Sequence, residues 1–284
     1  MDTAELIRLL DCPAPAKLNL FLHVIGRRAD GYHLLQTAFR LLDWGDALSF
    51  ELRNDDVVTR VTDLPGVSAE HDLVVRAARL LQSYTGCRRG ADIRVDKRLP
   101  MGGGLGGGSS DAATTLIALN RLWRTGVRRE ELAALGLRLG ADVPFFIFGR
   151  DAFAEGVGDE LHPLDLPPAW YVIVAPPVTV PTVEIFAAQE LTRNTEPIKI
   201  TDFAASTTRN DLQAVACSRY PEIGAAIDWL AQFAPARMTG SGACIFAQVA
   251  SEDDAERIVA SCPGSYRAWK ARSVMQHPLR NWVD

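Results

Sequence analysis

The sequence has little of what metal centres and disulfide-stabilised folds require. Its five cysteines are scattered over 284 residues without a C-x-x-C pair, and its five histidines include no H-E-x-x-H pattern. An odd number of scattered thiols favours reduced cysteines in a cytoplasmic compartment and argues against a structural zinc site. We expect no metal site built from protein ligands alone, and any metal to be a weakly held ion such as magnesium.

Basic excess and membrane-type segments are missing as well. The formal net charge is −5 and the arginines are spread along the chain, so no basic footprint for nucleic acid is present. The first residues lack the basic and apolar regions of a signal peptide. One long uncharged stretch, residues 166–183, contains five prolines and predicts a strand at 170–175 between turns. We expect a cytoplasmic protein without nucleic-acid or membrane partners.

Glycine, in contrast, is concentrated in one place. Six of the seven positions 102–108 are glycine, and two serines and a helical pattern follow. Glycine at this density suits a backbone that approaches a ligand closely, and consecutive N–H groups before a helix form an anion site. We predict a phosphate-binding loop leading into a helix near 110–123, with Ser109, Ser110 and Asp111 as candidate N-caps.

Three other interpretations of the glycine run are weaker. A Walker A loop requires a lysine directly after its last glycine, where this chain has Ser109. The G-x-G-x-x-G dinucleotide fingerprint is present, but a glycine-saturated run matches it by chance. Two helical patterns also follow where a strand with a ribose-binding acid belongs. A flexible linker would not be flanked by ordered patterns on both sides.

The hydrophobic pattern of the whole chain predicts an α+β protein. Residues 16–24 alternate strictly, which predicts a strand with Lys17 and Asn19 on one face. We place a domain boundary near residue 158, giving units 1–158 and 159–284. Further strands are expected near 34–42, 47–52, 57–61, 91–95, 151–156, 170–175, 243–250 and 266–270. Helices are expected near 73–83, 110–123, 129–139, 182–189, 211–218, 222–232 and 252–261.

Two charged residues are candidates for catalysis. Lys17 and Asn19 lie two apart on the predicted first strand, so an ammonium and an amide point the same way, about 7 Å apart. The alternative is a solvent-facing strand edge. Asp142 is flanked by apolar residues, and partial desolvation would raise the basicity of its carboxylate and suit it to removing a hydroxyl proton. The alternative is an N-cap ahead of Pro144.

Two turns add to these candidates. Residues 30–33 form a turn that presents Tyr32 and His33, and residues 239–242 form a second glycine-rich turn before a strand. Each alone is equally consistent with an ordinary surface turn. Their joint occurrence with the glycine loop, Lys17 and Asp142 indicates one site.

Together these segments resemble the GHMP family of small-molecule kinases. Residues 15–20 (Pro-Ala-Lys-Leu-Asn-Leu), the glycine loop at 100–110 and residues 239–244 (Thr-Gly-Ser-Gly-Ala-Cys) are similar to the family's three signature motifs. The resemblance covers nearly the whole chain, from about residue 14 to 272. Three more segments resemble one member of the family in particular: residues 26–33, 96–100 and 139–144.

The resemblance implies a two-domain GHMP kinase fold. Its N-terminal domain would bind nucleotide and resemble a ribosomal-protein domain, and its C-terminal domain would be a ferredoxin-like α/β sandwich. The implied reaction is phosphoryl transfer from ATP, with Mg²⁺ accompanying the nucleotide, to the 2-hydroxyl of a cytidyl sugar alcohol in the non-mevalonate isoprenoid pathway. The implied partners are ATP and that small-molecule substrate, and we expect a monomer or weak homodimer.

The same resemblance assigns roles to individual residues. Asp142 would accept the proton of the attacking hydroxyl, and Lys17 would orient Asp142 and stabilise the transferring charge. Lys97 would reach the nucleotide base, and Tyr32 and Phe186 would stack on cytosine. The implied substrate-binding residues are Asn19, Tyr32, His33, Thr182 and Phe186. The implied nucleotide-binding residues are Asp72, Lys97, Pro100, Met101, Gly102, Gly103, Gly104, Leu105, Gly106, Gly107, Gly108, Ser109, Ser110, Gly240, Ser241 and Gly242.

Two acidic residues depart from the family's pattern, which commonly has asparagine at both positions. Asp72 would lie near the adenine and lacks the amide donor of asparagine. Asp111 would place a negative charge beside the phosphates unless a metal or the helix N-terminus offsets it.

Two alternative functions stay open. One is a GHMP kinase for homoserine, mevalonate or a sugar, against which the Tyr32–His33 turn weighs. The other is a nucleotide-binding regulator without catalysis, against which Lys17 and Asp142 weigh.

Overall fold

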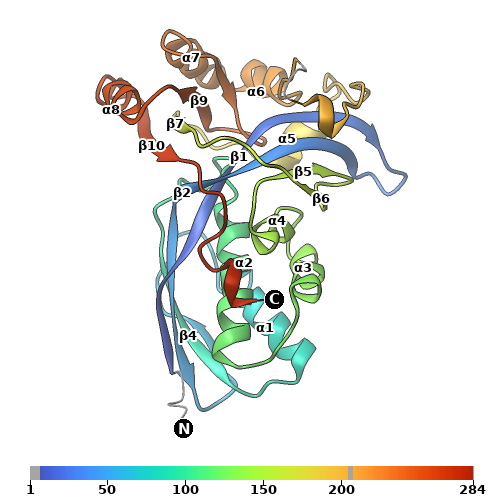
Figure 1. Ribbon diagram of the computed structural model, residues 1–284, viewed down its shortest axis with the longest axis vertical. Helices are drawn as coiled ribbons and strands as arrows, with labels where there is room; N and C mark the ends of the chain where they lie inside the picture. Colours follow the sequence, from blue (N-terminus) through green and yellow to red (C-terminus); the bar gives the residue numbers. More distant parts are fainter. Residues whose placement is uncertain (1–6, 204–206, 284) are drawn as a thin grey trace.

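A long antiparallel hairpin runs through the whole molecule. The computed structural model describes residues 7–203 and 207–283, and its first two strands are β1 (Arg8–Arg27) and β2 (His33–Arg53) (Figure 1). They pair along nearly their whole length, with four irregularities in the register between them. Such bulges bend a strand and increase its twist, so one hairpin contributes to both halves of the protein.

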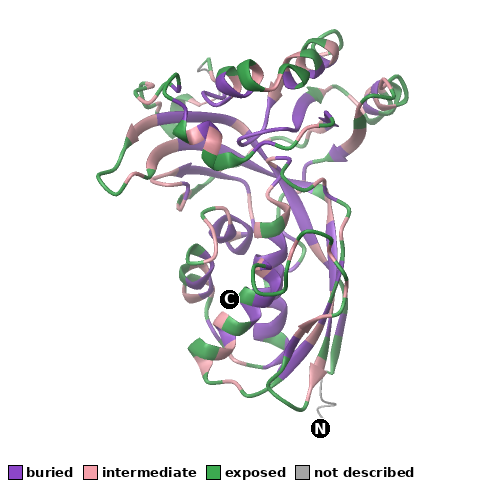
Figure 2. Cartoon of the chain, turned by 180° about the vertical axis from the view of Figure 1, so that it is seen from behind, coloured by how far each residue is buried: buried purple, intermediate pink, exposed green. Residues whose placement is uncertain are grey.

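The first half is a six-stranded sheet covered by helices. Its order is β3-β4-β2-β5-β6, with β1 also paired to β2. Helix α2 (Gly107–Leu122) lies against this sheet, and 12 of its 16 residues are buried, all of them from Ser110 onward (Figure 2). The remaining elements of this half are β3 (Val58–Arg60), β4 (Gly90–Asp96), β5 (Ala152–Glu155), β6 (Glu160–Pro163), α1 (Leu73–Thr85), α3 (Arg129–Leu137) and α4 (Val143–Phe148).

The second half is a four-stranded sheet with the order β10-β7-β9-β8. Leu22 and Val24 of β1 are buried in its core, which shows that the long hairpin joins the two halves. Its elements are β7 (Trp170–Ala175), β8 (Ala236–Met238), β9 (Ile245–Val249), β10 (Arg267–Arg272), α5 (Thr182–Ala187), α6 (Gln213–Arg219), α7 (Pro221–Leu230), α8 (Glu252–Ala260) and the 3₁₀ turns η1 (Ile200–Asp202) and η2 (Arg280–Trp282).

The division between the halves is not a single cut in the sequence. Strand β6 follows the predicted boundary at residue 158 but pairs with β5 in the first sheet. The last residues also return to the first half, where Leu279 and Val283 are buried in the core beneath the first sheet. Within the described residues, no helix is long and apolar enough to cross a membrane.

The predicted elements are present, with four differences. The strands expected at 34–42 and 47–52 form one strand, β2, because pairing with β1 continues past the intervening residues. Helix α4 was not predicted. The alternation at 16–24 does not separate a buried from an exposed face, because both sides of β1 are covered. The short strands β6 and β8 were not predicted.

Candidate active site

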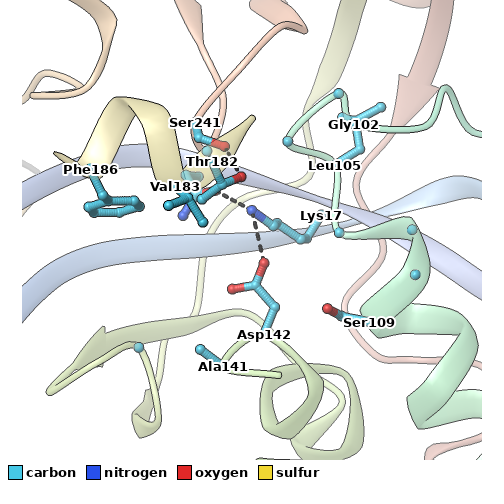
Figure 3. A pocket seen from close by; sticks show the side chains of 18 of the residues that line it. Lys17, Gly102, Leu105, Ser109, Ala141, Asp142, Thr182, Val183, Phe186 and Ser241 are labelled. Carbon is cyan, nitrogen blue, oxygen red and sulfur yellow. Dashed lines mark hydrogen bonds and ion pairs between the residues drawn. The ribbon is translucent and has the colours of Figure 1, made fainter. Parts of the chain in front are cut away.

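A cavity of about 990 Å³ lies where the long hairpin, the glycine loop, α5 and the turn at 240–242 meet (Figure 3). Every residue that the sequence assigned to the site lines this cavity except Ser110. Ser110 is fully buried, because consecutive residues of a helix point about 100° apart and Ser109 takes the cavity side. Its Oγ has no hydrogen-bond partner among the described residues.

The glycine loop continues directly into helix α2. The helix begins at Gly107, earlier than predicted, and its N-cap is Gly106 in the left-handed region (φ 74°). The prediction of a Ser109, Ser110 or Asp111 cap is therefore wrong. Gly106 makes no side-chain cap hydrogen bond. Without such a cap, the N–H groups of the first turn stay available to an anion in the cavity.

The second glycine-rich turn packs directly on the first loop. The N–H of Cys244 donates to the carbonyl of Gly103 at 3.1 Å. Gly104 has a φ of +75°, and a Cβ there would lie 2.2 Å from the carbonyl oxygen of Thr239. Glycine at 104 is therefore required by packing between the two halves, in addition to any contact with phosphate.

Lys17 and Asp142 form an ion pair at the centre of the cavity. Lys17 Nζ lies 3.4 Å from Asp142 Oδ2, and the two side chains are 3% and 33% exposed (Figure 3). Lys17 is on β1 and lies over the ring of Phe39, 5.4 Å from its centroid. Asp142 occupies the N-cap position of α4 but makes no side-chain cap hydrogen bond. The carboxylate points to Lys17 instead, and its catalytic role stays a prediction.

Asn19 holds the lysine in place. Its Oδ1 accepts a hydrogen bond from Lys17 Nζ, and its Nδ2 donates to Thr37 Oγ1 at 2.9 Å. The backbone N–H of Asn19 donates to Thr239 Oγ1 at 2.9 Å, which ties β1 to the second half. The predicted contact of Asn19 with the cytidyl end of a substrate stays a prediction.

Lys97 lies in a buried charge cluster beneath the glycine loop. Its Nζ contacts Asp46 Oδ2 at 2.5 Å and Asp111 Oδ2 at 2.7 Å. Burial raises the pKa of Asp111 to about 7; Lys97 opposes this rise and Asp46 adds to it. The charge of Asp111 is thus only partly offset, because Asp46 shares the same lysine. In this arrangement the ammonium of Lys97 is paired with carboxylates of the protein itself. Its predicted contact with the nucleotide base stays a prediction.

Asp72 has a structural role at the same end of the cavity. Its Oδ1 accepts from the N–H of Val74 at 2.8 Å and caps helix α1. Its Oδ2 pairs with Arg60 Nη1 at 2.5 Å, where both side chains are 7% exposed. The carboxylate is fully engaged in these contacts. Arg60, like Asp46, lies in no motif that sequence reasoning could have singled out.

The opposite end of the cavity is aromatic. Tyr32 is 66% exposed at the turn between β1 and β2. The ring of His33 lies 5.0 Å from that of Phe186 on α5, at 34° to it. Arg193, which was not predicted, donates from Nε to His33 Nε2 at 3.1 Å. Thr182 and Ser241 contact each other through their hydroxyls at 2.7 Å, which joins α5 to the second glycine-rich turn.

Comparisons with known proteins agree with this geometry. The GHMP kinase N-terminal domain model matches residues 72–150 and the C-terminal model matches 195–268. A 4-diphosphocytidyl-2-C-methyl-D-erythritol kinase from Aromatoleum aromaticum is 94% identical, with 100% of each chain covered. The chain belongs to the GHMP kinase family. A GHMP kinase of the same description from Azoarcus is 67% identical over 97% of this chain and 98% of its own.

Solved structures place this GHMP kinase in the same fold. A crystal structure of 4-(cytidine 5'-diphospho)-2C-methyl-D-erythritol kinase matches with a TM-score of 0.78 and 34% identity, covering 94% of this chain and 99% of that one. The mevalonate kinase of Methanococcus jannaschii shares the fold at 14% identity, with a TM-score of 0.66 over 96% and 100% of the two chains. The two-domain architecture implied by the motifs is confirmed, and membership of the family implies ATP as phosphoryl donor.

The donor set fits a magnesium ion that is bound chiefly by nucleotide. Among the described residues, no group of three or more His, Cys, Asp or Glu side chains could hold a metal by itself. Asp142 and Ser109 do supply oxygen atoms at the cavity wall, and oxygen is the ligand type that magnesium takes.

Proposed function

We propose that the protein transfers the γ-phosphoryl group of ATP to the 2-hydroxyl of 4-diphosphocytidyl-2-C-methyl-D-erythritol, giving the 2-phosphate and ADP. The reaction is a step of non-mevalonate isoprenoid precursor biosynthesis. The observation that carries the proposal is the Lys17–Asp142 ion pair, set between the glycine loop and the aromatic end of one cavity. The 94% identical relative bears the same activity in its name.

Asp142, Lys17 and the start of α2 have separate roles in phosphoryl transfer. Asp142 accepts the proton of the attacking hydroxyl or positions that hydroxyl, and its carboxylate is accessible enough to reach it. Lys17, anchored by Asn19, stabilises the charge of the transferring group. The N–H groups of residues 106–109 hold the triphosphate at the start of α2. Alignment and charge stabilisation of this kind supply most of the catalysis in phosphoryl transfer.

The remaining residues bind the two substrates. Tyr32, His33 and Phe186 contact the cytidine, while Thr182 and the turn at 240–242 close the site around the sugar alcohol and phosphates. Asp142 and Ser109 would supply oxygen ligands to an Mg²⁺ ion bound with the ATP, and that ion would neutralise part of the phosphate charge. The enzyme is cytoplasmic, which accords with five free cysteines, and it acts as a monomer or weak homodimer.

A substrate panel tests this proposal. ATP turnover is measured for wild type and Asp142→Asn with the cytidyl sugar alcohol, homoserine, mevalonate and galactose. We expect wild type to prefer the cytidyl compound, and Asp142→Asn to lose on the order of a hundredfold or more in kcat. No preference for the cytidyl compound would refute the substrate assignment. ATP binding without product from any acceptor would instead indicate a regulator.

A further inference from the structure

Arg193 holds His33 in a fixed orientation at the cavity wall. Its Nε donates to His33 Nε2 at 3.1 Å. The rest of its guanidinium is bound by backbone carbonyls around the end of α5, among them those of Phe186 at 3.1 Å, Ala188 at 2.5 Å and Leu191 at 3.0 Å. A guanidinium bound on several sides cannot rotate away, so its Nε–H direction is set by the backbone.

This contact determines where the imidazole carries its proton. An arginine N–H can only donate, so His33 Nε2 must accept and cannot carry a proton. In a neutral imidazole the proton then lies on Nδ1, the other nitrogen of the ring. Burial, and the nearby guanidiniums of Arg193 and Arg27, lower the pKa of His33 and keep the ring neutral.

The contact of His33 with Phe186 leaves this donor to a ligand in the cavity. Phe186 lies against the ring of His33, with 5.0 Å between centroids, and both residues line the cavity. The ring is therefore fixed by Phe186 on its face and by Arg193 at one nitrogen. The nitrogen left to a ligand is Nδ1, with its hydrogen.

We propose that Arg193 is a positioning residue for substrate recognition: it fixes the Nδ1–H tautomer of His33, which then donates to a hydrogen-bond acceptor on the pyrimidine base. The acceptors of cytosine are a ring nitrogen and a carbonyl oxygen, and a site with a fixed donor selects for bases that present such an atom. Arg193 itself does not contact substrate. This inference rests on the proposed function, since it needs a base at the aromatic end of the cavity.

Kinetics of Arg193→Gln measure the role of the tautomer. At pH 8 we expect the KM for the cytidyl substrate to rise about tenfold, with the KM for ATP and kcat within twofold, because one ligand hydrogen bond is weakened. Arg219→Gln is the matched control. Arg219 also contacts α5, through the carbonyl of Glu184 at 3.1 Å, and forms exposed ion pairs, but within the described part of the chain it makes no hydrogen bond to His33. It should leave all three constants unchanged.

The pH dependence separates a tautomer effect from loosening of α5. Without Arg193 the pKa of His33 rises, and protonation at pH 6 restores a hydrogen on Nδ1 whichever tautomer is present at pH 8. The ratio of the variant's KM to that of wild type should therefore fall to about threefold or less at pH 6. A ratio that stays the same at both pH values would mean that Arg193 only supports the backbone, and would overturn the proposal.

Nitrogen NMR gives a second, independent readout. In wild type labelled with ¹⁵N-histidine, and with His33 assigned by His33→Gln, we expect a protonated Nδ1 and an unprotonated Nε2; in Arg193→Gln the two nitrogens should exchange. A proton on Nε2 in wild type would overturn the proposal. If wild type failed to phosphorylate the cytidyl substrate, the proposed function would fall, while the spectrum would still decide the tautomer.

Discussion

The charge cluster beneath the glycine loop predicts an unusual pH dependence of stability, which Asp111→Asn should remove. Two carboxylates, Asp46 and Asp111, share the single ammonium of Lys97 in a largely buried position. One negative charge is therefore in excess when all three groups are ionised. Asp46 also accepts from the N–H groups of Arg98 at 2.6 Å and Leu99 at 2.8 Å, whereas burial raises the pKa of Asp111. The excess charge consequently falls on Asp111.

The magnitude follows from the pKa of Asp111, which burial raises from 3.8 to about 7. Because the folded value lies above the unfolded one, the contribution of this group to stability is present below pH 3.8. It is lost as the pH rises toward 7. Between pH 5 and pH 8 the linkage relation gives a loss of roughly 2–3 kcal/mol, since each pKa unit corresponds to about 1.36 kcal/mol. Asparagine cannot ionise, so Asp111→Asn should not show this loss.

Urea unfolding of wild type and variant at pH 5 and pH 8 measures the effect. Other groups titrate in this range, but their contributions cancel in the difference between the two proteins. We expect Asp111→Asn to gain roughly 2–3 kcal/mol in unfolding free energy relative to wild type on going from pH 5 to pH 8. Asp92→Asn is the control, because Asp92 forms a partly exposed ion pair with Arg53. Its replacement should change the free energy of unfolding by the same amount at pH 5 and at pH 8. A difference for Asp111→Asn that does not change with pH would refute the reasoning.

Four further outcomes are expected. Lys17→Met should lower kcat on the order of a hundredfold or more in steady-state assays, with both KM values changed far less, because it removes charge from the transition state. Gly104→Ala should abolish ATP binding in calorimetry, since its Cβ would lie 2.2 Å from a backbone carbonyl. Tyr32→Ala should raise the KM for the cytidyl substrate about tenfold and leave that for ATP unchanged. Burial, and to a lesser degree Arg129, lower the pKa of His277 to about 3, so its contribution to stability is present above pH 6.5 and is lost on acidification. His277→Gln should gain about 2 kcal/mol over wild type between pH 7 and pH 5 in urea titrations.

The sequence predicted the structure correctly where a local residue pattern coincides with a required backbone conformation. Helical spacing after residue 108 and glycine saturation before it predicted the loop and α2, because the close approach to Thr239 leaves room for glycine alone at position 104. Lys17 and Asn19 were predicted on one face of a strand, and their side chains do contact each other. The alternation that led to that prediction was nonetheless misleading about burial, since β1 is covered on both sides.

The sequence alone could not identify the side chains that pair with the buried charged residues. Asp46 lies 51 residues from Lys97, and Arg193 lies 160 residues from His33, so no spacing rule connects them. The roles of Lys97 and Asp72 depend on these partners. The family resemblance implied a role toward nucleotide for both, whereas the folded chain also uses their charges internally: Lys97 pairs with Asp46 and Asp111, and Asp72 pairs with Arg60.

Asp142 lies at the N-cap position of α4, yet its side chain does not cap the helix. Its place before Pro144 indicated a helix cap, and it does occupy the N-cap position of α4. A capping carboxylate normally accepts from the second or third N–H of the helix, but proline has no N–H to donate. The N–H of Val143 is already bonded to the carbonyl of Gly140 at 3.1 Å. The proline that suggested a cap therefore removes a donor that would hold the carboxylate at the helix, and this leaves Asp142 available to Lys17 and to an attacking hydroxyl.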